Sequence, residues 1–538
     1  MWSRAVTAAE DTRALRPPAR PDGRGTATPA SRTVFDDLVD RAARVGWCWS
    51  ALLTLVLGLY QMGRPELWRD ELASWSFASR PLPSLLAAAR RSGATQLAYY
   101  LALHAWISTF GDSADAMRTL SVLAMAASAA CVALVGRRLA GARAGLISGL
   151  IFTLVPSVSR FAQEIRFYAF EVLIATLALL LLLRALDRPS VWRWIAYGAS
   201  LAFLGYVDLV ALSVVAGHAA GVALRWWRDR DAGVLWFIPA AAVGLACCLP
   251  LVIVGSIQAG GQIEWVARPG MDLAVFSGFA RNMFYSTSVA AALILLAVLA
   301  WAVAWPEAAF MTAIAVVPVA AVWLISQGPH SYFMARYLLL TVAAWAVLAG
   351  IGLSRVDLRA AMACVIVVAI FGVGDQQVIR QPGAHSWAAY PAGTGGLYFG
   401  YAQAAEVIAT QVRAGDGAVY QGDGNPAGWM MIGAGVDYYL GRDLRGRHGV
   451  PAPHELFIAE TAAKAGVLYP RACKSAAACL GNEARIWVVG YGRASSPYPG
   501  LTPDQTLVLQ EHGYQVSYTK HVPGLTVFLL VKGNAAVG

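Results

Sequence analysis

Two adjacent carboxylates, Asp70 and Glu71, follow the first long apolar stretch of the chain. If that stretch crosses a membrane, the pair lies at the membrane surface, where a lipid-borne substrate can reach it. A carboxylate there can take a proton from a hydroxyl group, provided that its pKa and geometry suit. We therefore predict Asp70 as a catalytic base, with Glu71 beside it in the catalytic set. The alternative for this pair is the solvated start of a loop.

A second short segment, residues 163–169, is dense in charged and aromatic residues between two apolar stretches. Glu164, Tyr168 and Glu171 fall on one face of a helix. A charge at the edge of a membrane costs on the order of 2–3 kcal/mol, so such groups are usually functional or paired. We predict Glu164 as a further catalytic carboxylate that orients a substrate. The alternative is an internal pair between Arg166 and a glutamate that fixes helix packing.

Arginines next to apolar stretches suit a phosphate ligand. Arg166 lies in the second short segment, and Arg336 directly precedes the apolar stretch at 337–353. A guanidinium group matches the oxygens of a phosphate bidentately. We predict Arg166, Arg336 and the adjacent Tyr337 as a phosphate-binding set. For Arg336, the alternative is snorkelling to lipid headgroups.

Residues 96–111 are a further candidate for binding a substrate. Gln96, Tyr100 and His104 share one helical face at i, i+4 and i+8. This segment is short for a membrane span, and a helix lying in the interface explains both its length and its Tyr and Trp content. We predict that Tyr100, His104 and Tyr168 contact an acceptor or a sugar. The alternative is that His104 is an ordinary polar residue of the interface.

The elements that must position these residues are membrane spans. Of 538 residues, 58% are apolar and only 14% are charged. A soluble protein carries about 25% charged residues, so the composition excludes soluble, disordered and fibrous proteins. A helix needs about 20 residues to cross the hydrocarbon core, which predicts about eleven spans. They lie near 46–62, 118–136, 144–160, 166–184, 192–207, 209–224, 233–255, 287–304, 308–326, 337–353 and 360–378.

The arginines predict the orientation of these spans. The net charge is +10, and the arginines gather in short clusters between apolar stretches, as at 137–143 and 225–230. This is the positive-inside pattern of cytoplasmic loops, whereas a nucleic-acid binder would concentrate its charge on one face. We expect a disordered cytoplasmic tail at 1–42, a transmembrane domain at 43–379 and an extracytoplasmic α/β domain at 380–538.

The composition of the last 150 or so residues supports an exported α/β domain. Helical patterns at 401–413 and 503–513 alternate with short β-branched or aromatic runs. The runs predicted as strands are 417–420, 485–489, 514–519 and 525–531. Cys473 and Cys479 are the only cysteines there, and an oxidising compartment favours a disulfide between them. A zinc site would need two further ligands nearby, and none is visible.

Several of these motifs, in this order, resemble the GT-C-type membrane glycosyltransferases. The similarity is to the branch with the protein O-mannosyltransferases and the aminoarabinose transferases, and it covers roughly residues 46–340. The motifs are the acidic pair, Tyr99-Tyr100-Leu101-x-Leu103-His104-x-Trp106, Phe110-Gly111-Asp112-Ser113 before Arg118, Gln163-Glu164-x-Arg166-x-Tyr168-Ala169 and Arg336-Tyr337. The family commonly has Pro-Pro ahead of the Tyr-Tyr helix, where this chain has Ala94-Thr95-Gln96-Leu97-Ala98.

The resemblance implies an α-helical, polytopic enzyme of the plasma membrane. It implies inverting transfer of a sugar, mannose before a pentose, from a polyprenyl-phosphate donor to a hydroxyl of an exported protein, lipid or wall glycan. Members of the family differ in their need for a divalent cation, and no ligand cluster in this sequence demands one or any other cofactor. The alternatives are a polymerase or ligase of lipid-linked glycans and a transporter or flippase.

Reporter fusions after residues 140, 229 and 450 test the orientation. We expect cytoplasmic signals at the first two positions and an extracytoplasmic signal at the third, because arginine-rich loops are retained inside. A cytoplasmic signal at 450 would contradict the topology, and with it the placement of Asp70 outside the membrane.

Overall fold

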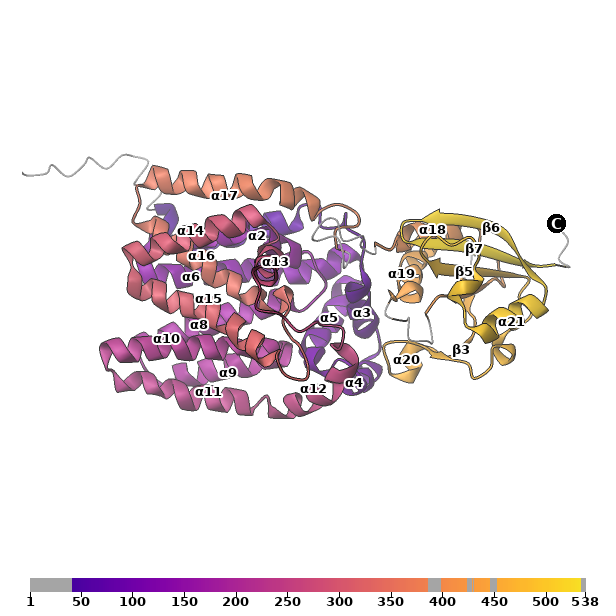
Figure 1. The fold of residues 1–538 in the computed structure, drawn as a ribbon, viewed down its shortest axis with the longest axis horizontal. Helices are drawn as coiled ribbons and strands as arrows, with labels where there is room; N and C mark the ends of the chain where they lie inside the picture. Colours follow the sequence, from indigo (N-terminus) through magenta and orange to yellow (C-terminus); the bar gives the residue numbers. More distant parts are fainter. Residues whose placement is uncertain (1–40, 386–397, 423–427, 429, 446–451, 534–538) are drawn as a thin grey trace, which may run out of the picture.

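The structure is a computed structural model that describes residues 41–385, 398–422, 428, 430–445 and 452–533, with the backbone alone at 259–262 and 442–445. The predicted tail at 1–42 lies almost wholly outside these residues. A body of helices and a C-terminal part with a β-sheet follow each other along the long axis of the molecule (Figure 1). The expected fold class, a polytopic helical protein with a C-terminal α/β domain, is confirmed. The domain boundaries stay predictions.

The helical body consists mainly of apolar helices that run along this axis (Figure 1). Their composition is dominated by Ala, Val, Leu and Ile, so most of their surface favours an apolar environment. They are α2 (Gly46–Leu59), α6 (Ala114–Leu154), α8 (Tyr168–Asp187), α9 (Val191–Val207), α10 (Val214–Asp229), α11 (Phe237–Ala246), α12 (Leu249–Gln262), α14 (Thr287–Val303), α15 (Trp305–Ile325), α16 (Val342–Ser354) and α17 (Leu358–Val378). The protein is therefore a multi-pass membrane protein.

The number of spans differs from the prediction. In the described residues, six helices are long and apolar enough to cross a membrane, or up to eight if each of two bent helix pairs is one span. The predicted count of about eleven is not confirmed. One cause is length, since α2 and α9 have only 14 and 17 residues. Another is that α6 joins the predicted spans 118–136 and 144–160 into one interrupted helix.

The interruption of α6 is a tight reversal of the chain. Gly141 has a φ of +90°, in the left-handed region that glycine adopts without steric cost. An added Cβ at Gly145 would lie 2.5 Å from the carbonyl oxygen of Ala133, so the residues before and after the break touch each other. The two halves of α6 therefore pack side by side, close to the two spans that the sequence predicts.

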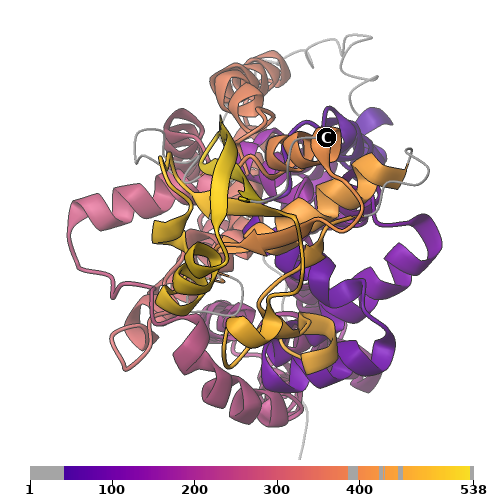
Figure 2. The same cartoon turned by 90° about the vertical axis from the view of Figure 1, so that its right-hand side faces the viewer.

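Short helices close the end of the body that faces the C-terminal part (Figures 1 and 2). They include α3 (Arg69–Ala78), α4 (Leu82–Arg91), η1 (Ala94–Gln96) and α5 (Leu97–Phe110). Other short elements are α7 (Pro156–Ala162), η2 (Val210–Ser213), α13 (Leu273–Phe284) and η4 (Ala335–Thr341). Helix α13 lies between the predicted spans 233–255 and 287–304 and meets α14 at a bend of 98°.

The C-terminal part contains a five-stranded sheet in the order β2-β1-β5-β7-β6. Its strands are β1 (Gly417–Tyr420), β2 (His454–Glu455), β5 (Arg485–Tyr491), β6 (Tyr514–Val522) and β7 (Leu525–Lys532). Strand β1 pairs in parallel with β2 and β5, and β7 pairs antiparallel with β5 and β6. The central strands β5 and β7 are buried along most of their length, which explains their unbroken apolar sequences.

All four predicted strands and both predicted helices of this part are present. The helices are α18 (Tyr401–Gln411) and α21 (Pro503–Glu511). A capping box between Thr502 and Gln505 starts α21, as expected for this pair of residue types. The sequence analysis missed α19 (Ile432–Arg445), α20 (Ala462–Ala465) and the short strands β2, β3 (Ile458–Glu460) and β4 (Arg471–Ala472).

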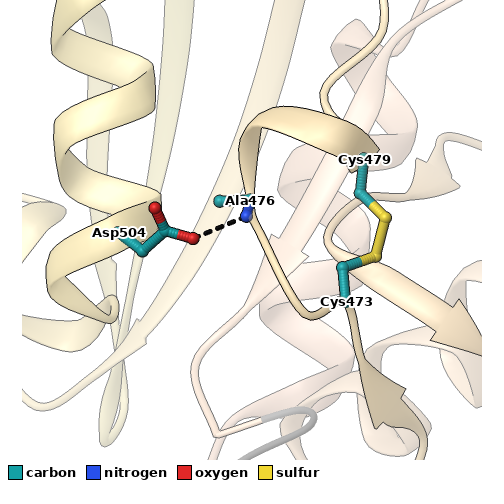
Figure 3. The surroundings of a disulfide bond; sticks show 4 residues. All are labelled: Cys473, Ala476, Cys479 and Asp504. Atoms are coloured by element: carbon teal, nitrogen blue, oxygen red, sulfur yellow. Dashed lines mark hydrogen bonds between the residues drawn. A yellow bond between two sulfur atoms is a disulfide. The ribbon is translucent and has the colours of Figure 1, made fainter.

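Cys473 and Cys479 form a disulfide in a small loop that follows β4 (Figure 3). Their Cα atoms lie 6.5 Å apart. Within the loop, the backbone N–H of Ala476 donates a hydrogen bond of 2.6 Å to Asp504 of α21. The disulfide and this hydrogen bond together fasten the end of β4 to the rest of the domain.

Candidate active site

A cavity of about 1720 Å³ lies where the helical body meets the C-terminal part. Its wall includes residues from the start of α3, the loop at 163–167, the turns η2 and η4, and C-terminal residues at 398–401 and 467–471. The charged residues of the wall are Glu66, Arg69, Asp70, Arg91, Arg166, Asp208, Arg336 and Arg471. Small-molecule pockets typically measure about 300–1,000 Å³, so this cavity has room for two reactants.

The structure brings together some of the predicted site residues and separates others from them. Those that line the cavity are Asp70, Arg166, Arg336 and Tyr337. Those outside its wall are Glu71, Glu164, Tyr100, His104 and Tyr168. The two groups have different surroundings, which decide what each residue can do.

Asp70 and Arg336 are in direct contact, although 266 residues separate them in the sequence. The Arg336 guanidinium nitrogen lies 3.3 Å from Asp70 Oδ2, and the two side chains are 15% and 18% exposed. On the other side of the carboxylate, Arg69 Nε lies 3.5 Å from Oδ1. The residue predicted to act as a base and the arginine predicted to bind the phosphate therefore lie side by side in the cavity wall.

Aromatic rings hold the guanidinium group of Arg336. Its central carbon lies 5.5 Å from the ring centre of Tyr337 and 5.8 Å from that of Trp265. Contacts of this kind attract a cation and restrict its orientation. The two rings thus restrict the position of a guanidinium group that belongs to the cavity wall.

Glu71 points away from the cavity into a buried ion pair with Arg118. Arg118 Nε donates to Glu71 Oε1 at 3.0 Å, and a terminal nitrogen donates to Oε2 at 2.8 Å. Both side chains are fully buried. Burial opposes ionisation of Glu71, but the charge of Arg118 outweighs it and holds the pKa of this carboxyl below its usual range. The contacts of Glu71 in this structure are those of a positioning residue, and its place in the catalytic set stays a prediction.

Arg118 also binds the backbone of the segment before α3, donating to the carbonyls of Met62 at 2.6 Å and Pro65 at 2.8 Å. In turn, Glu71 Oε1 accepts the N–H of Ile165 at 3.0 Å. One ion pair therefore joins the segment before α3, the start of α6 and the loop at 163–167. The sequence analysis missed this role of Arg118, although an arginine at the start of an apolar helix is a signal for it.

Glu164 is buried behind the cavity wall and holds Trp68. Its Oε1 accepts the indole N–H at 2.9 Å, and its Oε2 lies 3.0 Å from Arg160, one helical turn earlier. The ion pair is thus with Arg160 and not with Arg166. Burial raises the pKa of Glu164, and the charge of Arg160 offsets only part of this effect. Because Trp68 caps the helix that carries Asp70, Glu164 steadies that helix from behind.

The three residues predicted to contact an acceptor or a sugar are packed against the protein itself. The ring of Tyr100 stacks on Phe77, with centres 4.7 Å apart. His104 Nδ1 lies 2.8 Å from the carbonyl oxygen of Ala78. Tyr168 is fully buried. In this structure the shared helical face is used for packing, and the contact of these residues with an acceptor or a sugar stays a prediction.

The C-terminal part forms hydrogen bonds with the segment that leads into α3. The Tyr398 hydroxyl donates to Glu66 Oε1 at 2.7 Å, and the N–H of Ala402 at the start of α18 donates to Oε2 at 3.4 Å. Next to it, the N–H of Leu67 donates to the hydroxyl of Tyr439 at 2.8 Å. Burial raises the pKa of Glu66 despite these hydrogen bonds. The C-terminal part thus contributes to the position of the candidate base.

Asp208 is a further acidic residue of the wall, which the sequence analysis did not single out. It follows the last residue of α9, and its Oδ1 accepts the N–H of Val210 at 3.0 Å. Burial raises the pKa of Asp208 to about 7. Its place at the end of a predicted span was a usable signal. Within the described ranges, no three His, Cys, Asp or Glu side chains are grouped so that they could hold a metal ion.

Comparisons with known proteins bear on the fold. Residues 96–254 match the family described as dolichyl-phosphate-mannose-protein mannosyltransferase. The structure of apo ArnT from Cupriavidus metallidurans is similar at a TM-score of 0.58 and 14% identity, over 92% of this chain and 100% of that one. ArnT from the same organism bound to undecaprenyl phosphate gives 0.57 and 14%, over 94% and 99%. A search of curated proteins gave no significant match.

The chain has the same fold as ArnT. The resemblance predicted from the sequence is confirmed, and with it the expectation of a glycosyltransferase. The matched stretch 96–254 contains Arg118, Glu164 and Arg166. The roles of individual residues rest on the geometry of this chain.

We expect Asp70→Asn to lower the rate of sugar transfer about 100-fold or more, in line with the loss of a general base. Donor affinity should survive, because Arg166 and Arg336 remain in the wall. Transfer rate and donor affinity are measured in nanodiscs. Asp115→Asn is the matched control, since Asp115 is exposed at the start of α6 and outside the cavity wall. Near-normal turnover of Asp70→Asn would overturn the assignment of the base.

Proposed function

We propose that this protein transfers a sugar, most simply mannose, from a polyprenyl-phosphate donor to a hydroxyl group of an exported acceptor. The reaction takes place at the extracytoplasmic face of the plasma membrane, with the N-terminus in the cytoplasm and the C-terminal domain outside. The observation that carries the proposal is the contact of Asp70 with Arg336 in the cavity wall. The carboxylate suits the proton of a hydroxyl group, and the guanidinium group suits a phosphate.

In the proposed step, the acceptor oxygen attacks the anomeric carbon while Asp70 takes the hydroxyl proton. The bond between that carbon and the phosphate oxygen breaks, and its electron pair stays on the phosphate. The products are a glycoside and polyprenyl phosphate. Attack opposite the phosphate inverts the anomeric centre. Because the leaving phosphate gains negative charge, fixed cations beside it stabilise the transition state more than the bound donor.

Two arginines in the wall suit this charge. The guanidinium group of Arg336 contacts the rings of Tyr337 and Trp265, and Arg166 is only 8% exposed. The part of the wall formed by α15 is apolar, as the prenyl chain requires. The ArnT structure that contains undecaprenyl phosphate supports a lipid phosphate as the class of donor.

The acceptor enters between the helical body and the exported domain in this proposal. The domain contributes Tyr398, Tyr401, Tyr469 and Arg471 to the wall, so an acceptor that reaches Asp70 passes along its surface. Aromatic and polar groups of this kind suit a protein, a lipid headgroup or a wall glycan equally. The step as written needs no cofactor of its own.

The donor is tested with a panel of labelled polyprenyl-phosphate sugars and a membrane extract as the source of acceptor. We expect the purified protein to release polyprenyl phosphate from the mannose donor and to ignore diphosphate-linked oligosaccharides. Arg336→Ala should weaken donor use, and Arg336→Lys should restore it only in part, because lysine lacks the planar fork. Arg355→Ala is the control, since Arg355 is exposed and outside the wall.

Two results would contradict the proposal. If no polyprenyl-phosphate sugar is turned over, the reaction class is wrong. If Arg336→Ala keeps full activity, Arg336 has only the role of a residue that reaches for lipid headgroups.

A further inference from the structure

Two side-chain oxygen atoms of residues that line the cavity lack a hydrogen-bond partner within the part of the chain that the structure describes. They are Asp208 Oδ2 and Ser213 Oγ, and both atoms are shielded from solvent. Both residues line the cavity, and Asp208 is only 8% exposed. Buried polar groups are hydrogen-bonded in the great majority of proteins, so two such atoms in one wall indicate a ligand that supplies the missing bonds.

The position of these groups relative to Arg336 indicates which part of a ligand they meet. Ser213 ends η2, Asp208 stands two residues before it begins, and η2 packs against η4, which carries Arg336. A donor sugar is joined to its phosphate through a single oxygen atom. A sugar whose phosphate is bound by Arg336 therefore extends into the neighbourhood of η2.

The chemistry of the two groups excludes the other parts of the donor. Neither group carries the positive charge that attracts a phosphate, and a prenyl chain offers no hydrogen bonds. A sugar ring presents adjacent hydroxyl groups that both donate and accept. A carboxylate oxygen and a serine hydroxyl match such a ring, after no more than a rotation of the side chains between rotamers.

We propose that Asp208 and Ser213 form the subsite for the sugar ring of the donor. This inference rests on the proposed function. It assigns the contacts to the sugar ring, which Asp70 and Arg336 do not provide. The two residues touch the sugar away from the anomeric carbon, so they determine specificity and do not take part in the chemical step. A site built to bond a hydroxyl group strongly rejects an analogue without it, because its own buried polar groups then stay unpaired.

A neighbouring serine provides a matched control. Ser256 also lines the cavity, but its hydroxyl already donates to the carbonyl of Ile253 at 2.8 Å. The hydrogen of the Ser256 hydroxyl is therefore already used, and removing this hydroxyl takes no free donor from a ligand. Removing the Ser213 hydroxyl removes one of the proposed contacts.

The test measures binding to the full-length protein in nanodiscs for each sugar lipid of the donor panel and for sugar-free polyprenyl phosphate. In the wild type, we expect the sugar to raise the affinity of at least one lipid above that of the sugar-free lipid. Ser213→Ala and Asp208→Asn should each reduce this gain about 5- to 10-fold, the usual effect of losing one hydrogen bond. Both variants should bind sugar-free polyprenyl phosphate as the wild type does, and Ser256→Ala should keep the gain.

Three results would overturn the subsite. They are a wild type that binds no sugar lipid better than the sugar-free lipid, a gain that survives in both variants, and equal weakening of both kinds of lipid. Binding of the sugar-free lipid also reports whether each variant is folded. Failure of the proposed function gives a different pattern, in which a sugar lipid binds preferentially and yet is not turned over.

Discussion

The ion pair between Glu71 and Arg118 is the constraint on which the geometry of the cavity depends. Both side chains are fully buried, and removal of two charges from water costs several kcal/mol per ion. The cost is offset here because the pair is bidentate and because Arg118 also binds the carbonyls of Met62 and Pro65. Loss of one partner would leave an uncompensated charge. The start of α3 is therefore fixed against the start of α6.

The direction of Asp70 follows from this pair. Neighbouring residues of a helix point about 100° apart, so burial of Glu71 against α6 turns Asp70 towards the cavity. The same carboxylate accepts the N–H of Ile165, which places the loop that carries Arg166. Arg336, which is distant in the sequence and lies on η4, completes the set. The C-terminal part acts on the same segment through its hydrogen bonds to Glu66, so both parts of the protein position one short stretch of chain.

The sequence predicted the elements well where length and pattern decide them, and less well where a long-range contact does. Apolar stretches and continuous strands such as β5 and β7 were recognisable, whereas the reversal within α6 depends on the packing of its halves around Gly141. Asp70 and Arg336 stood out because a charge beside an apolar stretch is costly and needs a reason. For His104, helical periodicity showed which residues share a face, but not that this face meets α3. Asp208 was missed because a single acid at the end of a span resembles many others.

The most direct test of this account is a double-mutant cycle with Glu71→Gln, Arg118→Gln and the double variant, measured as kcat together with the affinity for polyprenyl phosphate. If the pair positions Asp70, each single variant loses about tenfold or more in kcat with little loss of affinity. The kcat of the double variant is then no lower than that of the less active single variant, because both changes remove the same interaction. Losses that multiply, or single variants with normal kcat, would contradict the claim that this pair holds the active site in place.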